Sequence, residues 1–248
     1  MSANGRSISS IPALTASTVR VMLTRPPTFN RIVSEVYQSA NRSLGFVSLT
    51  LAFFGMILVY QGCMQAMRIY PDLSSAGAIV IKTMVRVFGP LLTGLMVAFR
   101  VGAGIAAEAG TMVVTDQADA LTVSGSTTTR WLVAPRFAAC IIGVPLLTTI
   151  GIGAGVLAGG AFAWARFDIL PATFFRIYMV EWEDVVICFI KSFLNGATIP
   201  IVAGAAGLAT RNSSEGVGIA TTNAVVNSAV AVVIIEFLVS FIASVTGH

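Results

Sequence analysis

Histidine and charged residues are what this sequence has least of. Only one histidine occurs among the 248 residues, His248, and Asp, Glu, Lys and Arg together make up 10% of the chain. Soluble domains carry about 25% charged residues, so the polar surface of a water-soluble fold is missing. One terminal histidine cannot build a catalytic triad or a histidine metal cluster. With 56% hydrophobic residues and a mean hydropathy of +0.86, the composition indicates a membrane protein.

Cysteine and nucleotide-binding motifs are also scarce. Cys63, Cys140 and Cys188 lie far apart in apolar runs, without metal or redox spacing, and we expect them to be small buried residues. No GxxxxGK[ST] loop occurs, so any ATP-driven step needs a second chain. The net charge of +4 in so apolar a chain points to membrane topology and lipid head groups, not to nucleic acid. We therefore expect no catalytic residue, metal or cofactor in this chain.

Five apolar stretches are long enough to span a bilayer, which takes about 20 residues. They are residues 44–67, 78–98, 137–164, 185–208 and 224–245. Residues 1–16 are Ser-rich and are expected to form a flexible cytoplasmic N-terminus. The fold class is thus all-α integral membrane, with residues 17–248 as one domain.

The segment 17–42 is too charged to span and apolar enough to lie on a membrane. Its apolar residues Ile32, Val33, Val36 and Tyr37 recur at helical spacing after Pro26-Pro27. This pattern predicts an interfacial amphipathic helix, with a disordered linker as the alternative.

The distribution of Lys and Arg predicts the orientation. With the N-terminus inside, nine arginines are internal: Arg6, Arg20, Arg25, Arg31, Arg42, Arg100, Arg130, Arg136 and Arg211. Three are external: Arg68, Arg166 and Arg176. The excess favours a cytoplasmic N-terminus, and five spans then put the C-terminus on the outer side.

Small residues and prolines mark two further features of the spans. Gly151, Gly155 and Gly159 recur every four residues, which lets helix backbones approach closely within the bundle or between two copies. Pro145 and Pro200 fall inside spans, where kinks are expected.

Ionisable residues inside spans are costly, by about 2.5–3.5 kcal/mol or more on insertion scales. Arg86, Lys191 and Glu236 all fall about 9–13 Å from the outer ends of their spans at the helical rise of 1.5 Å per residue. We expect Glu236 to pair with Lys191 or Arg86, and the remaining positive charge to face a lipid phosphate. A structural ion pair is the alternative. Gln61, at the outer end of the first span, is a weaker candidate for the same cavity.

The internal segment 100–136, between spans two and three, contains an amphipathic stretch of about 20 residues that predicts a helix along the cytoplasmic face. Glu108, Asp116 and Gln117 interrupt its apolar residues. Exposed acids on such a helix suit the docking of a soluble partner, although an ordinary surface helix fits the pattern equally well.

Residues 89–121, GPLLTGLMVAFRVGAGIAAEAGTMVVTDQADAL, resemble the signature of the MlaE (YrbE) permease family. The similarity continues at 134–137 (APRF), 145–148 (PLLT), 190–192 (IKS), 216–222 (GVGIATT), 224–228 (AVVNS) and 236–237 (EF), and covers roughly residues 20–245. One departure is Val87 after Arg86, where many relatives have an acid.

The resemblance implies the membrane subunit of an ATP-binding-cassette (ABC) transporter that moves phospholipids between the bacterial inner membrane and a periplasmic MCE-domain protein, helping to maintain outer-membrane lipid asymmetry. It implies a homodimer, a cytoplasmic ATPase partner that binds ATP and Mg²⁺, and a coupling helix at 106–124. A small cytoplasmic regulator is left open. The lipid cavity would hold Gln61, Arg86, Lys191 and Glu236.

Two other functions were weighed. An ion-gradient-driven transporter fits buried charges, but no internal duplication is evident and five spans do not divide into two equal repeats. An intramembrane enzyme would need a nucleophile with a base or paired acids, and Glu236 is the only acid well inside a predicted span.

Overall fold

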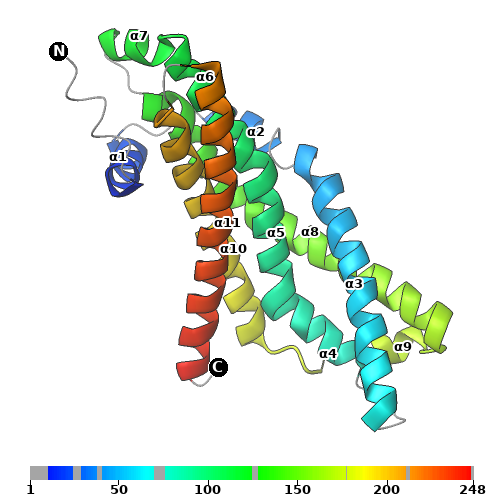
Figure 1. Ribbon diagram of the computed structural model, residues 1–248. Helices are drawn as coiled ribbons and strands as arrows, with labels where there is room; N and C mark the ends of the chain where they lie inside the picture. Colours follow the sequence, from blue (N-terminus) through cyan, green and yellow to red (C-terminus); the bar gives the residue numbers. More distant parts are fainter. Residues whose placement is uncertain are drawn as a thin grey trace.

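The computed structural model describes residues 11–24, 29–37, 41–69, 76–124, 128–176, 178–210 and 213–246, and the regular structure in these ranges is helical. Long helices lie side by side (Figure 1), with α1 (Ile11–Thr24), α2 (Phe29–Val36) and α7 (Gln117–Val123) at one end. The short α9 (Pro171–Phe174) lies at the other end, with the end of α11 (Ser214–Val245). The predicted all-α class is confirmed.

Five helical runs among the described residues are long and apolar enough to cross a membrane, as predicted. They are α3 (Arg42–Ile69); the run of α4 (Ala76–Thr83), η3 (Met84–Phe88), α5 (Gly89–Val97), η4 (Ala98–Gly102) and α6 (Ala103–Val114); η5 (Thr129–Val133) with α8 (Ala134–Phe167); α10 (Trp182–Leu208); and α11. Each contains one predicted span. With 32 residues, α11 extends over about 48 Å, so its ends pass beyond a hydrocarbon core of about 30 Å.

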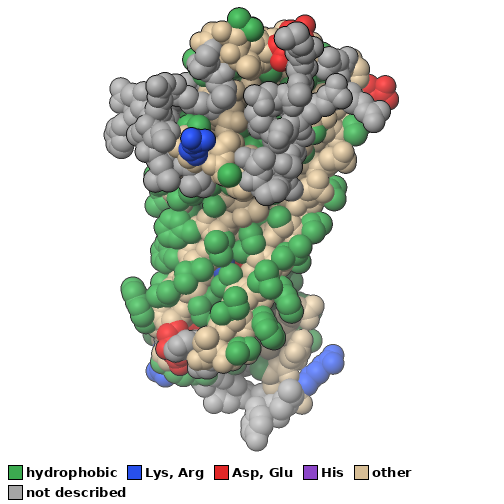
Figure 2. Space-filling model, turned by 90° about the vertical axis from the view of Figure 1, so that its left-hand side faces the viewer, with side chains coloured by type: hydrophobic (Ala, Val, Ile, Leu, Met, Phe, Trp, Pro, Cys, Tyr) green, Lys and Arg blue, Asp and Glu red, His purple; other side chains and the backbone are tan. Residues whose placement is uncertain are grey.

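The outer surface of the bundle is apolar around its middle. Figure 2 shows hydrophobic side chains across the central part of one face, with charged side chains near the two ends. On α3 the exposed side chains Phe46, Leu49, Phe53 and Ile57 recur at helical spacing. Large exposed apolar side chains of this kind are stable in lipid rather than in water, so the chain is a multi-pass membrane protein.

The N-terminal segment forms two helices where one was predicted over 17–42. Residues 25–28 and 38–40 of the predicted helix lie outside the described residues. Helix α1 buries Leu14 against Val133 and Ile201. Helix α2 packs on α8 and leaves Val33 and Tyr37 exposed, as a helix at a membrane surface would.

The glycine repeat of α8 serves packing inside the bundle. A Cβ on Gly155 would lie 2.8 Å from the carbonyl oxygen of Leu51, and one on Gly159 would lie 3.2 Å from that of Gly55, both on α3. Helices α3 and α8 therefore touch backbone to backbone, which resolves the two uses left open by the sequence.

The second span does not end where the cytoplasmic segment was expected to begin. Helix α6 continues the run from η4 and buries Ile105, Ala106 and Ala109, packing on α10 and α11. The run ends at Thr115, and Asp116 takes a left-handed conformation with φ of 57° before α7 starts. The predicted helix 106–124 is thus two helices, of which only α7 lacks buried residues.

Candidate functional site

The predicted pair of buried charges exists between α10 and α11. Lys191 Nζ lies 2.9 Å from Glu236 Oε2, and the side chains of the two residues are 0% and 8% exposed. Two opposite charges at this depth compensate each other where neither would be tolerated alone.

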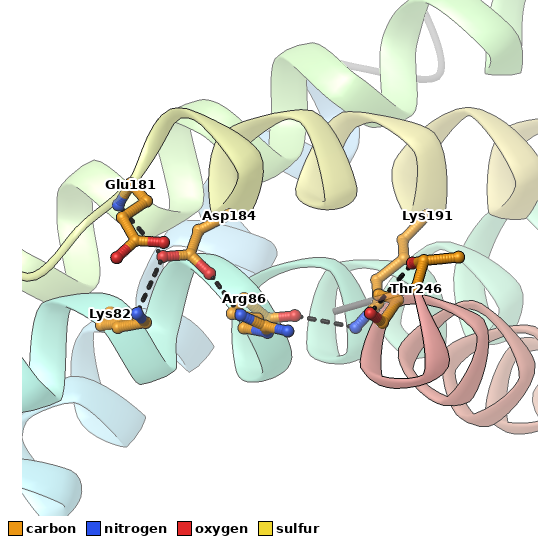
Figure 3. A network of polar contacts seen from close by, with 7 residues as sticks. Lys82, Arg86, Glu181, Asp184, Lys191 and Thr246 are labelled. Atoms are coloured by element: carbon orange, nitrogen blue, oxygen red, sulfur yellow. Dashed lines mark hydrogen bonds and ion pairs between the residues drawn. The ribbon is translucent and has the colours of Figure 1, made fainter. Parts of the chain in front are cut away.

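Lys191 also completes the backbone of the second span. In an α-helix the carbonyl of Arg86 would accept a hydrogen bond from residue 90, but Pro90 has no N–H. The chain widens into the π-helical turn η3 just before this proline. Lys191 Nζ donates to the Arg86 carbonyl oxygen over 2.7 Å (Figure 3) and so replaces the missing donor.

Arg86 itself pairs with a residue that the sequence argument did not select. Its Nη1 donates to Asp184 Oδ1 over 2.8 Å, and Lys82 Nζ lies 3.4 Å from Asp184 Oδ2 (Figure 3). The Asp184 side chain is fully buried. It occupies the third position of α10 and accepts from the Glu181 backbone N–H in a capping box. One carboxylate therefore caps a helix and holds two cations of the second span.

Asn195 connects the same charges to the second span from the other side. Its Nδ2 lies 3.3 Å from Glu236 Oε1 and 3.4 Å from the Pro90 carbonyl oxygen. The absence of a side chain at Gly94 leaves room for it, because a Cβ there would lie 2.8 Å from Asn195 Nδ2.

We call Lys82, Arg86, Asp184, Lys191 and Glu236 the α10 network. It holds three cations against two carboxylates. The side chains of Lys82 and Arg86 are 33% and 28% exposed, whereas Asp184 and Lys191 are sealed. The positive excess therefore lies at the accessible edge of the network, where an anionic group can approach.

An apolar groove runs along the same part of α10 and α11. Its volume is about 510 Å³, within the range of small-molecule sites of about 300–1,000 Å³. Its walls are mainly aliphatic, with Ile187, Ile190 and Leu194 from α10 and Val239 from α11, and Glu183 is the charged side chain among its lining residues. An acyl chain suits such a lining.

Gln61 is not joined to the α10 network by any hydrogen bond in the part of the chain that the structure describes. It is exposed near the end of α3. Gln61 lies at the same end of the bundle as Lys82 and Asp184, so its depth in the membrane is similar to theirs. Its place in a shared cavity stays a prediction.

The three residues assigned to partner docking take different positions around the α6–α7 bend. Glu108 on α6 pairs with Arg136 of α8, whose Nε lies 3.5 Å from Glu35 Oε2 on α2. Asp116 forms the bend, and Gln117 begins α7. We call Glu35, Glu108 and Arg136 the α2/α6 cluster. Sequence reasoning identified Glu108 without this pairing.

Within the described ranges no group of three or more His, Cys, Asp or Glu side chains is arranged to hold a metal ion. The three cysteines are buried and unpaired. The site is therefore a set of charges held by ion pairs, with an apolar groove along the same part of α10 and α11.

Comparison with known proteins identifies relatives over almost the whole chain. Residues 32–242 match the family model described as "Permease MlaE". A "Probable ABC transporter permease protein" of Rickettsia bellii is 35% identical, over 94% of this chain and 89% of its own length. A protein of the same description from Synechocystis is 33% identical, over 81% and 76% of the two chains. "Protein TRIGALACTOSYLDIACYLGLYCEROL 1, chloroplastic" of Arabidopsis thaliana is 31% identical, over 93% and 66%.

Proposed function

The chain belongs to the MlaE permease family of ABC transporters, and from this premise we propose that it is the subunit that moves phospholipid across its membrane. A permease of this class is a transport component, and the ATPase of the complex is a separate chain. We propose that ATP and Mg²⁺ bind that partner.

The lipid proposal is supported by two features at the same end of α10: the apolar groove between α10 and α11, and the partly exposed cations Lys82 and Arg86 that pair with Asp184. A phosphate at Lys82 and Arg86 would be held by charge-assisted hydrogen bonds, while an acyl chain lies between α10 and α11. The Arabidopsis relative is named after a diacylglycerol glycolipid, which supports a lipid substrate here as well.

The helical run 76–114 offers a direct mechanical link between the two ends. It carries Lys82 and Arg86 near one end and leads to Asp116 and α7 at the other. Thirty residues of helix correspond to about 45 Å. We propose that the ATPase docks at Glu108, Asp116 and Gln117, and that its movement tilts this run and reshapes the groove.

A second copy of the chain is part of the proposal. Only 22% of the most apolar window of α11 is buried, against 56% for α10, so α11 has a broad apolar face that a second α11 can cover. The transported lipid would pass to or from a periplasmic MCE-domain protein on the side of α9. In this proposal the chain spans a bacterial inner membrane with its N-terminus in the cytoplasm, the orientation that the distribution of arginines favours. The complex would serve outer-membrane lipid asymmetry.

The deciding experiment purifies the tagged chain from native membranes and identifies the co-purifying proteins and lipids. We expect an ATPase, an MCE-domain protein and bound phospholipid. Glu236→Gln should keep these partners and lose ATP-dependent lipid transfer in proteoliposomes, whereas Glu215→Gln, in the first turn of α11, should transfer at the wild-type rate. A chain that purifies without an ATPase, or a Glu236→Gln variant with full transfer, contradicts the proposal. The first outcome would favour the gradient-driven transporter, with Glu236 as its coupling acid.

A further inference from the structure

A second pocket lies at the opposite end of the membrane helices from the α10 network. It has a volume of about 320 Å³ and is formed by α2, the start of α3, η4 with α6, and the start of α8. Figure 1 shows α2, α6 and the start of α3 at the same end of the bundle. Its lining includes the α2/α6 cluster together with Arg42, Ser43 and Arg100.

The charges of this pocket are unbalanced. Both acids, Glu35 and Glu108, are within ion-pair distance of Arg136. Among the residues that the structure describes, no carboxylate lies within 4.0 Å of Arg42 or Arg100. The pocket therefore has three cations against two acids, a net charge of +1, and both acids lie at Arg136 and away from Arg42 and Arg100.

A buried hydroxyl also points to a ligand. Ser43 is 1% exposed, and its Oγ has no hydrogen-bond partner in the described part of the chain although it lines the pocket. Leaving a buried polar group unpaired costs about 1–3 kcal/mol. An oxygen-bearing anion between Arg42, Ser43 and Arg100 would accept this hydrogen bond and contact both guanidinium groups, and a single negative charge balances the net charge of the pocket.

The surface below Arg42 indicates what the anion is attached to. Phe46, Leu49 and Phe53 follow Arg42 at offsets of four, seven and eleven residues, so they share one face of α3 with it. All three are exposed, each by 46% or more. A cationic head position above an apolar stripe matches the two parts of a phospholipid.

We propose that this pocket binds the phosphate of a phospholipid from the adjacent leaflet, with an acyl chain along the Phe46–Phe53 stripe. The proposal goes beyond transport, because the pocket is separate from the α10 network and its groove. A lipid held here contacts α2, α3 and α6 together, so it would tie the surface helix to the coupling segment. The shared chemistry is a phosphate, which a free phosphate ion could also supply.

Native mass spectrometry of the full chain, delipidated in detergent, tests the proposal without any transport partner. The chain is titrated separately with phosphatidylglycerol, with diacylglycerol of the same acyl chains and with inorganic phosphate. We expect the dissociation constant of the first phosphatidylglycerol molecule to rise at least tenfold in the double variant Arg42→Gln/Arg100→Gln. The dissociation constant of diacylglycerol should stay unchanged. Arg68→Gln is the control, because Arg68 lies in the last turn of α3 at its opposite end.

A second variant fills the pocket without changing its charge. A Cβ on Gly104 meets no atom within 4 Å, and this residue lines the pocket. Gly104→Leu should therefore fold and weaken the same phosphatidylglycerol binding tenfold. Equal phosphatidylglycerol affinity in the arginine variant and Arg68→Gln overturns the site. Inorganic phosphate that binds as tightly as phosphatidylglycerol and displaces it overturns the lipid assignment.

Discussion

The α10 network and the α2/α6 cluster use the same pairing of acids with Lys or Arg in different surroundings. Asp184 and Lys191 are fully buried, whereas in the cluster the side chains of Arg136, Glu35 and Glu108 are 17%, 22% and 48% exposed. A buried pair is held by the penalty that breaking it would cause, and an exposed pair is weakened by water and salt. We therefore expect the buried pairs of the network to resist change more than the ion pairs of the cluster, which water and salt can reach.

The largest effect is expected from breaking the buried pair. Glu236→Ala leaves Lys191 charged and without its acid, which costs about 3–5 kcal/mol. The measurement is the unfolding free energy in mixed detergent micelles. The double variant Lys191→Met/Glu236→Leu should recover part of this loss, because apolar residues can replace a buried pair. It should stay about 1–3 kcal/mol below wild type, because the Arg86 carbonyl loses its donor. A single variant as stable as wild type would show that the pair is not sealed.

Removal of the other buried carboxylate comes second. Asp184→Asn deprives Lys82 and Arg86 of their shared acid and should lower the unfolding free energy by about 3 kcal/mol. Asp119→Asn is the matched control, because Asp119 is an exposed acid in the first turn of a different helix, α7. Similar losses in the two variants would contradict the role of Asp184.

Two glycine substitutions compare how tightly the two regions are packed, without changing any charge. Gly94→Ala pushes on Asn195 beside the network and should cost about 1–3 kcal/mol through overpacking. Gly104→Ala at the edge of the cluster meets open space and should gain about 0.5–1 kcal/mol from helix propensity. Circular-dichroism melting of both variants measures this. Melting temperatures that shift in the same direction in the two variants would contradict the proposed difference in packing.

The smallest effect is expected in the cluster. Arg136→Gln removes both ion pairs but should cost at most about 1 kcal/mol, a difference that shrinks further in high salt. Melting at low and high salt measures this dependence. A loss of several kcal/mol that persists in high salt would mean that the cluster is as closed as the network.

The sequence predicted the part of the site that depends on depth alone. Arg86, Lys191 and Glu236 fall at similar distances from the ends of their spans, so the sequence predicted that Glu236 pairs with Lys191 or Arg86. The structure selects Lys191. Asp184 was missed because it lies outside the span predicted from apolar residues. Its only local signal is the spacing of Glu181 and Asp184, which is typical of a capping box, and its burial depends on how Lys82 and Arg86 pack over it.

The division of segment 106–124 could not be predicted from its amphipathic pattern. Its first half is small and apolar, so it fits both a surface helix and a buried one. The packing of Ala106 and Ala109 close to Gly207 of α10 decides in favour of burial. A left-handed residue at Asp116 is equally hidden in the sequence, although Asp is one of the few residues that tolerate this conformation.

The bond from Lys191 to the Arg86 carbonyl has a genetic consequence. The Lys191 side chain donates the hydrogen bond that the backbone N–H of residue 90 would donate in an α-helix if that residue were not proline. Positions 90 and 191 are therefore mutually dependent, although they lie 101 residues apart. A residue other than proline at 90 restores the ordinary backbone donor and removes one of the two reasons for keeping the lysine. Suppressors of Lys191 variants should therefore map to position 90 as well as to Glu236, and homologues that lose the proline should be free to lose the lysine only where the acid has gone too.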